Sequence, residues 1–386
     1  MPREYPTVLD LVGETPIVRL DRIGRDVAPT LLAKLEYLNP GGSLKDRSGL
    51  AMIEAAEREG KLKPGGTIVE PTSGNTGVGL AIAAALKGYR CIFVMPDKMS
   101  QEKISMLRAY GAEVVITPTA VEHDSPESYY SVSDRLAEEI PGGFKPDQYS
   151  NMANPEAHYR TTGPEIWEQT DGGDVDAIVI SVGTGGTISG VGRYFKERRP
   201  GVLIVGVDPE GSVYTAKDVS DLHPYLVEGI GKDTWPATMD REIVDRWVRV
   251  SDRDSFVTAR RLAREEGILS GGSAGTTVWA ALEIAGDFGP DATILTVLPD
   301  SGRSYLSKFY DDNWMLQYGF LERKAPAPTI EQVLRFKRAE EHEVPDLVTI
   351  ESHQKVGEAI GLMQRYSISQ LPVVRQEPAD SLADVV

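Results

Sequence analysis

The sequence predicts a doubly wound α/β fold, in which helices cover both faces of a mostly parallel sheet. Apolar runs of strand length alternate with helical runs from Ala33 to Val297, which is the order of a doubly wound chain. Gly88 and Gly111 each follow a helical run and precede an apolar run, as C-terminal helix caps do. A length of 386 residues and a hydrophobic content of 41% are enough for two or three domains with a large core.

The first distinctive segment is a loop of small residues at positions 39–47, with the sequence Asn-Pro-Gly-Gly-Ser-Leu-Lys-Asp-Arg. Small residues let the backbone approach a ligand closely, and the amine of Lys45 can form a Schiff base with an aldehyde. A Lys-Asp-Arg triplet is, by itself, more often the solvated start of a helix. The interpretation therefore depends on three loops that come later in the chain.

The second loop, residues 71–77, follows a predicted strand and precedes a helical run over 78–86. A helix N-terminus leaves unpaired N–H groups and a partial positive charge. The hydroxyl groups of Thr72, Ser73 and Thr76 add donors for a carboxylate. An ordinary capped helix start explains this loop about equally well when it is taken alone.

The third loop follows the buried-strand pattern of residues 177–182 and consists of Gly183, Thr184, Gly185, Gly186 and Thr187. A dinucleotide site does not fit, because the third glycine of that motif would fall on Ile188, and no glycine loop is followed by Lys and Ser or Thr as in a nucleotide-binding P-loop. The segment instead predicts a phosphate site at the start of a helix. A fourth loop, residues 270–275, precedes another helical run over 277–285.

These four loops, in this order, resemble the pyridoxal-phosphate-dependent family that contains cysteine synthase and cystathionine β-synthase, over about residues 11–321. The resemblance implies a fold type II enzyme with two doubly wound α/β subdomains, the lesser one at about residues 41–141, and pyridoxal 5′-phosphate in the cleft between them. It also implies a homodimer.

The resemblance assigns roles to individual residues. Lys45 would bind the cofactor covalently, Asn75 would hydrogen-bond its 3′-oxygen, and Ser273 would face its pyridine nitrogen. The third loop would hold the phosphate group. The remaining residues implied to bind the substrate are Thr72, Ser73, Thr76, Gln148 and Gly229.

The residue types suit a β-replacement reaction. A serine cannot keep the pyridine nitrogen protonated as a carboxylate would, so the cofactor becomes a weaker electron sink, which favours elimination. Lys45, once displaced by the substrate amine, is expected to act as general base at Cα and to protonate the leaving hydroxyl. A thiol then adds to the resulting aminoacrylate. The expected reaction replaces the hydroxyl of serine by homocysteine and gives cystathionine.

Two further candidate catalytic residues favour the cystathionine-forming branch of the family. Tyr149 and Glu228 stand where cysteine synthases typically carry phenylalanine and glutamine, and a phenol or a carboxyl group can assist a hydroxyl leaving group. Tyr149 could equally be an amphipathic wall residue. Two alternatives remain: a cysteine synthase that uses O-acetylserine or serine with sulfide, and a non-catalytic binding protein with a decayed copy of the fold.

Composition points to a cytoplasmic enzyme with small-molecule substrates. The formal charge of −17 argues against nucleic acid or an anionic membrane surface as a partner. The longest apolar helical run is far shorter than the ~20 residues of a membrane span, and no signal peptide is apparent. Cys91 is the single cysteine, and the five histidines show no metal spacing, so no metal site is expected. The haem site of some animal members of the family is not expected either, because no N-terminal cysteine–histidine pair precedes the predicted core.

The composition changes after the predicted catalytic core, residues 1–323. Residues 324–343 are predicted to be a linker with a highly charged helical stretch. Residues 344–386 resemble the opening of a CBS domain, a regulatory module often used in pairs to bind adenosyl ligands. Because this segment is too short for a whole module, we expect it to be incomplete and unable to form a paired adenosyl site.

Overall fold

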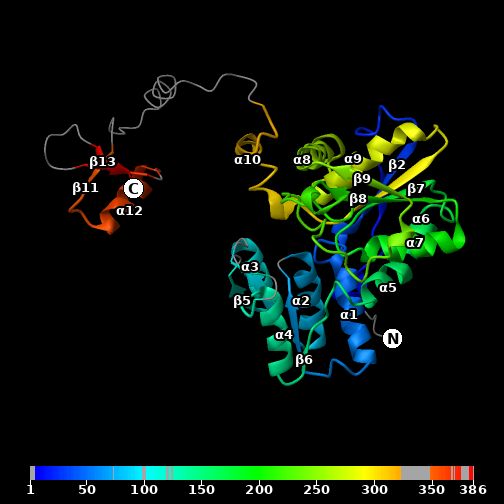
Figure 1. The fold of residues 1–386 in the computed structure, drawn as a ribbon, viewed down its shortest axis with the longest axis horizontal. Coiled ribbons are helices and arrows are strands. Elements are labelled where there is room, and N and C mark those ends of the chain that lie inside the picture. The colour runs from blue at the N-terminus through cyan, green and yellow to red at the C-terminus, as the bar shows by residue number, and fades with distance from the viewer. Residues whose placement is uncertain are drawn as a thin grey trace. The chain divides into compact units, whose positions relative to one another are not determined.

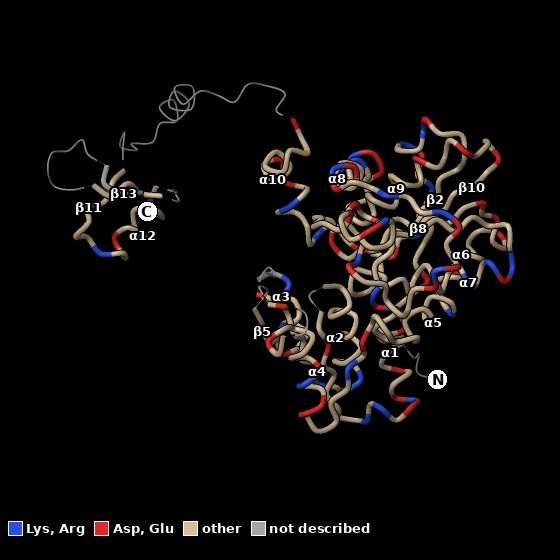
Figure 2. Tube along the Cα trace, in the orientation of Figure 1, with Lys and Arg blue, Asp and Glu red and all other residues tan. Residues whose placement is uncertain are grey.

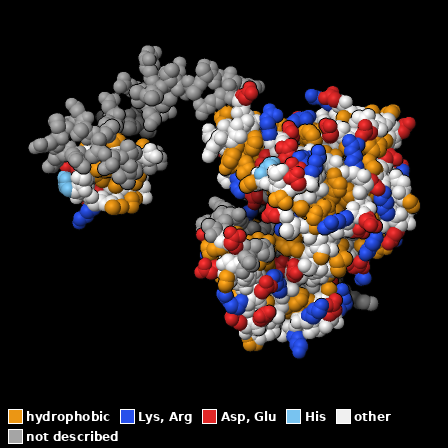
Figure 3. Space-filling model, viewed as in Figure 1, with side chains coloured by type: hydrophobic (Ala, Val, Ile, Leu, Met, Phe, Trp, Pro, Cys, Tyr) orange, Lys and Arg blue, Asp and Glu red, His pale blue; other side chains and the backbone are white. Residues whose placement is uncertain are grey.

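The computed structural model describes residues 5–72, 74–97, 101–118, 121–122, 125–322, 348–366, 368, 370–374 and 382–385. The chain divides into two units, Met1–Leu321 and Glu322–Val386. Figure 1 shows two sheets with their helices in the first unit. Acidic and basic residues are interspersed along the described parts of both units (Figure 2) and are mixed across the face in view in Figure 3.

The larger sheet of the first unit has six strands in the order β1-β2-β10-β7-β8-β9. Only β1 is antiparallel to its neighbour, and the other pairs are parallel. The strands are β1 (Ile17–Arg19), β2 (Thr30–Leu35), β7 (Ala177–Ser181), β8 (Leu203–Pro209), β9 (Arg246–Val250) and β10 (Thr293–Leu298). Every residue of β7 is buried, as expected of a central strand covered on both faces.

Helices cover both faces of this sheet. Alternate residues of β7 point to opposite sides, since Val179 belongs to one apolar cluster and Ile178 to another. The first cluster includes residues of α9 (Gly272–Ile284), and the second includes residues of α7 (Gly186–Arg198). The other helices of this lobe are α5 (Ala153–Arg160), α6 (Thr162–Gln169), α8 (Asp252–Arg261) and α10 (Asp312–Gln317).

The smaller sheet has four parallel strands in the order β5-β4-β3-β6. They are β3 (Thr67–Pro71), β4 (Arg90–Pro96), β5 (Glu113–Thr117) and β6 (Gly143–Phe144). One face packs on α1 (Lys45–Arg58), α2 (Asn75–Lys87) and α3 (Gln101–Ala109), and the other on α4 (Tyr129–Glu139). The predicted α/β class with two doubly wound subdomains is therefore confirmed.

A close crossing of α1 and α2 fixes the position of the predicted cofactor lysine. A Cβ added to Gly49 of α1 would lie 2.8 Å from the carbonyl carbon of Gly79, and one added to Gly79 of α2 would lie 2.6 Å from the carbonyl oxygen of Lys45. Only glycine allows the two backbones to approach this closely. The crossing places the first turn of α1 directly beside α2.

Short connecting helices complete the first unit. They are 3-10 helices at Val8–Leu11, Glu36–Leu38, Val219–Asp221, Arg241–Ile243, Ala285–Asp287 and Gly302–Tyr305, and a π-helical turn at Leu262–Glu266. Gly88 and Gly111, predicted as helix caps, both have positive φ. Among the residues that the structure describes, no helix is long and apolar enough to cross a bilayer.

The described residues of the second unit form a small sheet and one helix. Strand β12 (Pro372–Val374) pairs in parallel with β11 (Ile350–Glu351) and antiparallel with β13 (Leu382–Val385). Ile350 and Leu371 are buried, whereas α12 (Val356–Tyr366) has no buried residue. The predicted linker, residues 324–343, lies wholly outside the described residues. The resemblance of this unit to an incomplete CBS domain stays a prediction.

Candidate active site

A cleft of about 630 Å³ lies between the two lobes of the first unit, where the four predicted loops meet. Its walls come from segments that follow the carboxyl ends of parallel strands, which is the usual ligand position in such sheets. The predicted residues that line it are Lys45, Thr72, Asn75, Thr76, Gln148, Tyr149, Gly183, Thr184, Gly185, Thr187, Glu228, Gly229 and Ser273. Two predicted residues are not among them. Gly186 packs against Asn154 instead, and Ser73 lies outside the described residues.

Lys45 is the first residue of α1 and is partly buried in this cleft. Burial lowers the pKa of its ammonium group to about 8, and the charge of Asp300 acts in the opposite direction. No acidic side chain of the described residues forms an ion pair with Lys45. A buried amine without a close counter-ion is held partly neutral near physiological pH, as a nucleophile or base requires.

The residue two positions later has a different environment. Arg47 Nη2 lies 2.7 Å from Glu36 Oε1 and 2.7 Å from Glu165 Oε2, and Lys34 Nζ lies 2.7 Å from the same Glu165 oxygen. All four side chains are at most 8% exposed. Burial opposes the charge of Arg47, but the two glutamates outweigh it and raise its pKa. This buried charge cluster ties α1 to β2 and α6.

The second loop is held from across the cleft. Thr76 Oγ1 donates to Gln148 Oε1 at 2.7 Å, and Asn75 Nδ2 donates to Asp300 Oδ2 at 2.9 Å. The buried carboxylate of Glu70 accepts the backbone N–H groups of Asp147 and Gln148 at 2.9 and 3.2 Å. The segment that carries Gln148 and Tyr149 is thereby fixed to β3.

The third loop presents the N-terminus of α7, a helix of 13 residues. Gly185 adopts a φ of +82°, which a residue with a side chain rarely does. The carbonyl oxygens of Gly183 and Thr184 accept hydrogen bonds from Tyr214 Oη at 2.6 Å and Thr238 Oγ1 at 2.7 Å. With these carbonyl groups engaged away from the cleft, the N–H groups at the start of the helix remain for an anion.

His158 supports this loop from behind and was not singled out by the sequence. It is fully buried, with Nε2 3.2 Å from Thr187 Oγ1 and Nδ1 2.9 Å from Thr162 Oγ1. Burial, followed by the charges of Arg47 and Lys45, holds its pKa well below the usual value. The imidazole is therefore neutral and has one donor nitrogen and one acceptor nitrogen.

Tyr149 and Glu228, the two residues predicted to assist the leaving group, face the same cleft but differ in charge. Burial raises the pKa of Tyr149, which keeps its phenol protonated, and Lys232 Nζ lies 4.2 Å from its ring centroid. Burial also raises the pKa of Glu228, but ion pairs with Lys103 and Lys308 outweigh it and lower the pKa below its usual value. Glu228 is thus an anion between two cations, which disfavours a role as proton donor.

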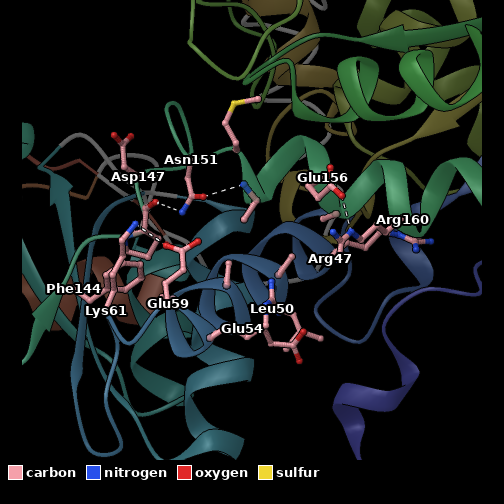
Figure 4. Close-up of a pocket in the computed structure, with 18 of the residues that line it drawn as sticks. Arg47, Leu50, Glu54, Glu59, Lys61, Phe144, Asp147, Asn151, Glu156 and Arg160 are labelled. Carbon is pink, nitrogen blue, oxygen red and sulfur yellow. Dashed lines mark hydrogen bonds and ion pairs between the residues drawn. The ribbon is translucent and has the colours of Figure 1, made fainter. Parts of the chain in front are cut away.

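A second groove, of about 830 Å³, lies on the outer side of α1, against α5 and the segment after β6. Figure 4 shows its lining, with Glu156 and Arg160 facing each other. Its charged side chains pair locally, as in the contacts of Lys61 with Glu59 and of Arg160 with Glu156, both at 2.6 Å. None of the predicted site residues lines this groove.

The cleft fits a phosphorylated aldehyde, since it combines a partly neutral lysine with a glycine-rich helix N-terminus. Residues 8–300 match the sequence profile of the family described as pyridoxal-phosphate dependent enzyme. The chain belongs to this family. Its cofactor is accordingly pyridoxal 5′-phosphate.

Within this family, the chain is similar to curated cystathionine β-synthases. It is 52% identical to the protein of Oryctolagus cuniculus over 328 residues, which are 84% of this chain and 59% of that one. It is 46% identical to the protein of Mus musculus over 98% of this chain and 68% of that one, and 42% identical to the protein of Saccharomyces cerevisiae over 96% and 78%. The chain thus spans about three fifths of the rabbit protein's length.

Solved structures of the family share the fold. O-ureido-L-serine synthase superposes with a TM-score of 0.75 at 38% identity and covers 82% of this chain and 100% of its own. A hydrogen sulfide-producing enzyme from Fusobacterium nucleatum has a TM-score of 0.73 at 36% identity, over 78% of this chain and 98% of its own. These similarities confirm the fold type II architecture expected from the four loops.

Proposed function

We propose that the chain catalyses the β-replacement of the hydroxyl group of serine by homocysteine to give cystathionine. The observation that carries this proposal is the convergence of Lys45, the N-terminus of α7 and the pair Tyr149 and Glu228 in one cleft. The similarity to cystathionine β-synthases over most of the chain supports the choice of substrates. A cysteine synthase reaction is the less favoured use of the same cleft.

The cofactor would be held at four points. Lys45 would bind it covalently, Gly183, Thr184, Gly185 and Thr187 would hold its phosphate at the start of α7, and Ser273, in the first turn of α9, would face its ring nitrogen. Asn75, in the first turn of α2, would contact its ring oxygen. When bound, pyridoxal phosphate supplies an electron sink for the negative charge that forms at the substrate Cα.

The chain's own groups then bind the substrate and move its proton. Thr72, Thr76 and Gln148 would bind the carboxylate of serine, together with Gly229 and the undescribed Ser73. Lys45 Nζ, released when the substrate amine replaces it, would take the proton from Cα. Its pKa of about 8 leaves part of the population neutral, as this step requires. The same amine would return the proton to the departing hydroxyl.

Tyr149 and Glu228 would have different roles in the cleft. The protonated phenol of Tyr149 can donate a hydrogen bond to the leaving oxygen, to which Lys45 delivers the proton, because the raised pKa of Tyr149 keeps its phenol neutral. Glu228 would hold Lys103 and Lys308 at the cleft instead of donating a proton, since its charge is balanced by both. This assignment differs from the sequence-based expectation that both residues act on the leaving group.

Product identity tests this proposal directly. Purified protein loaded with cofactor is given serine with homocysteine, and separately O-acetylserine with sulfide, and the products are identified by mass spectrometry. We expect cystathionine from the first pair at a higher kcat/KM than cysteine from the second. Turnover of the second pair alone would replace the proposal with a cysteine synthase.

A comparison of two substrates with different leaving groups tests the role of Tyr149. The Tyr149→Phe variant should lose about 10²-fold in kcat with serine, because the departing hydroxyl loses the hydrogen bond that the phenol donates as charge develops on its oxygen. It should lose much less with O-acetylserine, whose acetate leaves more readily. Glu228→Gln serves as the matched comparison and should change the two substrates equally. Equal losses in Tyr149→Phe would make Tyr149 a structural wall residue.

We further propose that the chain acts as a homodimer, as the family resemblance implies. Exposed apolar side chains of the first unit, among them Leu11, Leu38 and Met152 at 52–60% exposure, are compatible with a subunit contact. Light scattering over a concentration series measures the mass directly. A mass equal to one chain of 42.1 kDa at all concentrations would reject the dimer.

A further inference from the structure

Asp300 is a buried residue of the cleft to which the proposed function assigns no role. It lies after β10, is 5% exposed, and its backbone joins two of the four loops. It forms an antiparallel bridge with Ser43, just before Lys45, and its carbonyl oxygen accepts the N–H of Gly271 at 3.0 Å. Asp300 therefore stands where the first and fourth loops meet.

The side chain of Asp300 also contacts the second loop, residues 71–77. Its Oδ2 accepts hydrogen bonds from Asn75 Nδ2 at 2.9 Å and from Tyr305 Oη at 2.7 Å. Its Oδ1 is buried and has no hydrogen-bond partner in the described part of the chain. Asn75 belongs to the smaller lobe and Asp300 to the larger one, so this contact crosses the cleft beside the position proposed for the cofactor ring.

The fourth loop is shaped around this carboxyl group. A Cβ added to Gly271 would lie 1.9 Å from Asp300 Oδ1, a distance that no side chain tolerates. The absence of a side chain at position 271 leaves room for the carboxyl group of Asp300. Ser273, in the first turn of α9, follows two residues later. Any side chain at position 271 must move Asp300.

A carboxylate is an unusual partner for an amide because it distinguishes the two ends of the amide. The oxygen and the NH2 group of asparagine have nearly the same shape, and the side chain can turn over with little steric cost. Asp300 Oδ2 accepts from both Asn75 and Tyr305, so it holds the NH2 end of the amide. Burial raises the pKa of Asp300, and these two hydrogen bonds oppose that shift. The second N–H of that group and the carbonyl oxygen then have defined directions.

We propose that Asp300 is a positioning residue that fixes the direction of the Asn75 amide and thereby the hydrogen bond that Asn75 offers to the ring oxygen of the cofactor. The inference rests on the proposed function only in taking Asn75 as the residue that contacts this oxygen. It assigns to Asp300 no contact with substrate or cofactor. The orphan Oδ1 is explained as the oxygen that Gly271 leaves room for.

Two variants test this from opposite sides. Asp300→Ala removes the acceptor, and Gly271→Ala displaces it without changing any polar group. Both variants should bind pyridoxal phosphate about tenfold more weakly, which is the effect of losing one hydrogen bond. Both should also change the ratio of the absorption bands of the bound cofactor, because this ratio depends on the hydrogen bond at the ring oxygen. Cofactor affinity is measured by fluorescence titration and the band ratio by absorbance across a pH series.

The matched control is Asp208→Ala. Asp208 is also buried, also has one oxygen bonded to neighbours, Thr215 N at 2.9 Å, and one orphan oxygen, but it does not line the cleft. The control should lose stability without changing the band ratio. Thermal melts of all variants identify any that fail to fold.

The double variant Asp300→Ala with Gly271→Ala tests whether the two single substitutions act through the same contact. With the carboxyl group absent, alanine at position 271 has room, so the double variant should resemble Asp300→Ala alone rather than the sum of both changes. Additive losses, or a wild-type band ratio in a folded Asp300→Ala variant, would overturn the proposal. These readouts need only bound cofactor, so they remain informative even if the protein makes no cystathionine.

Discussion

Lys45 and Arg47 lie two residues apart in the first turn of α1 but face different surroundings. Arg47 points into a buried cluster with Glu36, Glu165 and Lys34, where charges of opposite sign are in contact. Lys45 is desolvated in the cleft without an ion-pair partner among the described residues. Burial lowers the pKa of Lys45, whereas in Arg47 the neighbouring glutamates overcome the same effect and raise it. Between Lys45 and Arg47, the two glutamates beside the arginine therefore account for the opposite directions of the pKa shifts.

The largest effect should come from removing the reactive cation. Lys45→Ala should lower turnover by at least ~10⁴-fold, the upper range for loss of a general base, and should abolish covalent attachment of the cofactor. The fold should persist, because the buried charge cluster is untouched. Borohydride reduction of the wild-type protein followed by peptide mapping should label Lys45. A label on a different lysine would defeat the assignment.

Removing the structural cation should instead affect stability. Arg47→Met leaves Glu36 without its main counter-ion and should lower the free energy of unfolding by about 3–5 kcal/mol, measured by urea denaturation. The control is Arg160→Met, whose side chain is 69% exposed and pairs with Glu156, and which should cost about 0–1 kcal/mol. Equal losses in the two variants would contradict a special role for the cluster.

The pH dependence of turnover sharpens the same contrast. The amine of Lys45, with a pKa of about 8, is protonated below that pH and cannot accept a proton from the substrate. The rate should therefore rise with pH by about tenfold per unit below pH 8 and level off above it. A kcat profile that stays flat between pH 6.5 and 9 would show that proton removal by this amine does not limit the rate.

The smallest expected effect concerns His158. If its Nε2 carries the proton, His158 donates to Thr187 Oγ1 and leaves the Thr187 hydroxyl proton for the phosphate. His158→Gln keeps a donor near Nε2 and should bind cofactor almost normally. His158→Asn is too short to reach Thr187 and should bind about tenfold more weakly by fluorescence titration. Similar affinities for both variants would remove Thr187 from this chain of hydrogen bonds.

The sequence predicts those parts of the site that are built from adjacent residues. A strand, a glycine-rich segment and a helix follow one another within about a dozen positions, so the loops before Asn75, Thr187 and Ser273 could be recognised. Helix starts were less well predicted. The helical runs were expected over 78–86 and 277–285, but α2 begins at Asn75 and α9 at Gly272, because glycine and small polar residues in a first turn have no apolar periodicity.

The parts that sequence could not supply depend on contacts between distant segments. Asn75 and Asp300 are 225 residues apart, and Lys103 and Glu228 are 125 apart. Neither pair has a local pattern that marks it. The sequence also does not indicate the two lysine partners of Glu228, whose part in assisting the leaving group stays a prediction. His158, a single histidine in a helix, likewise gives no motif until the fold brings it against Thr187.

The crossing of α1 and α2 at Gly49 and Gly79 restricts how this cleft can diverge during evolution. Because the two helices touch through their backbones, the spacing between Lys45 and the loop before α2 cannot be changed by exchanging one side chain for another. Tyr149 and Glu228, which also line the cleft, take no part in this crossing. The crossing therefore restricts where Lys45 can lie, whereas side chains at positions 149 and 228 can change without disturbing it.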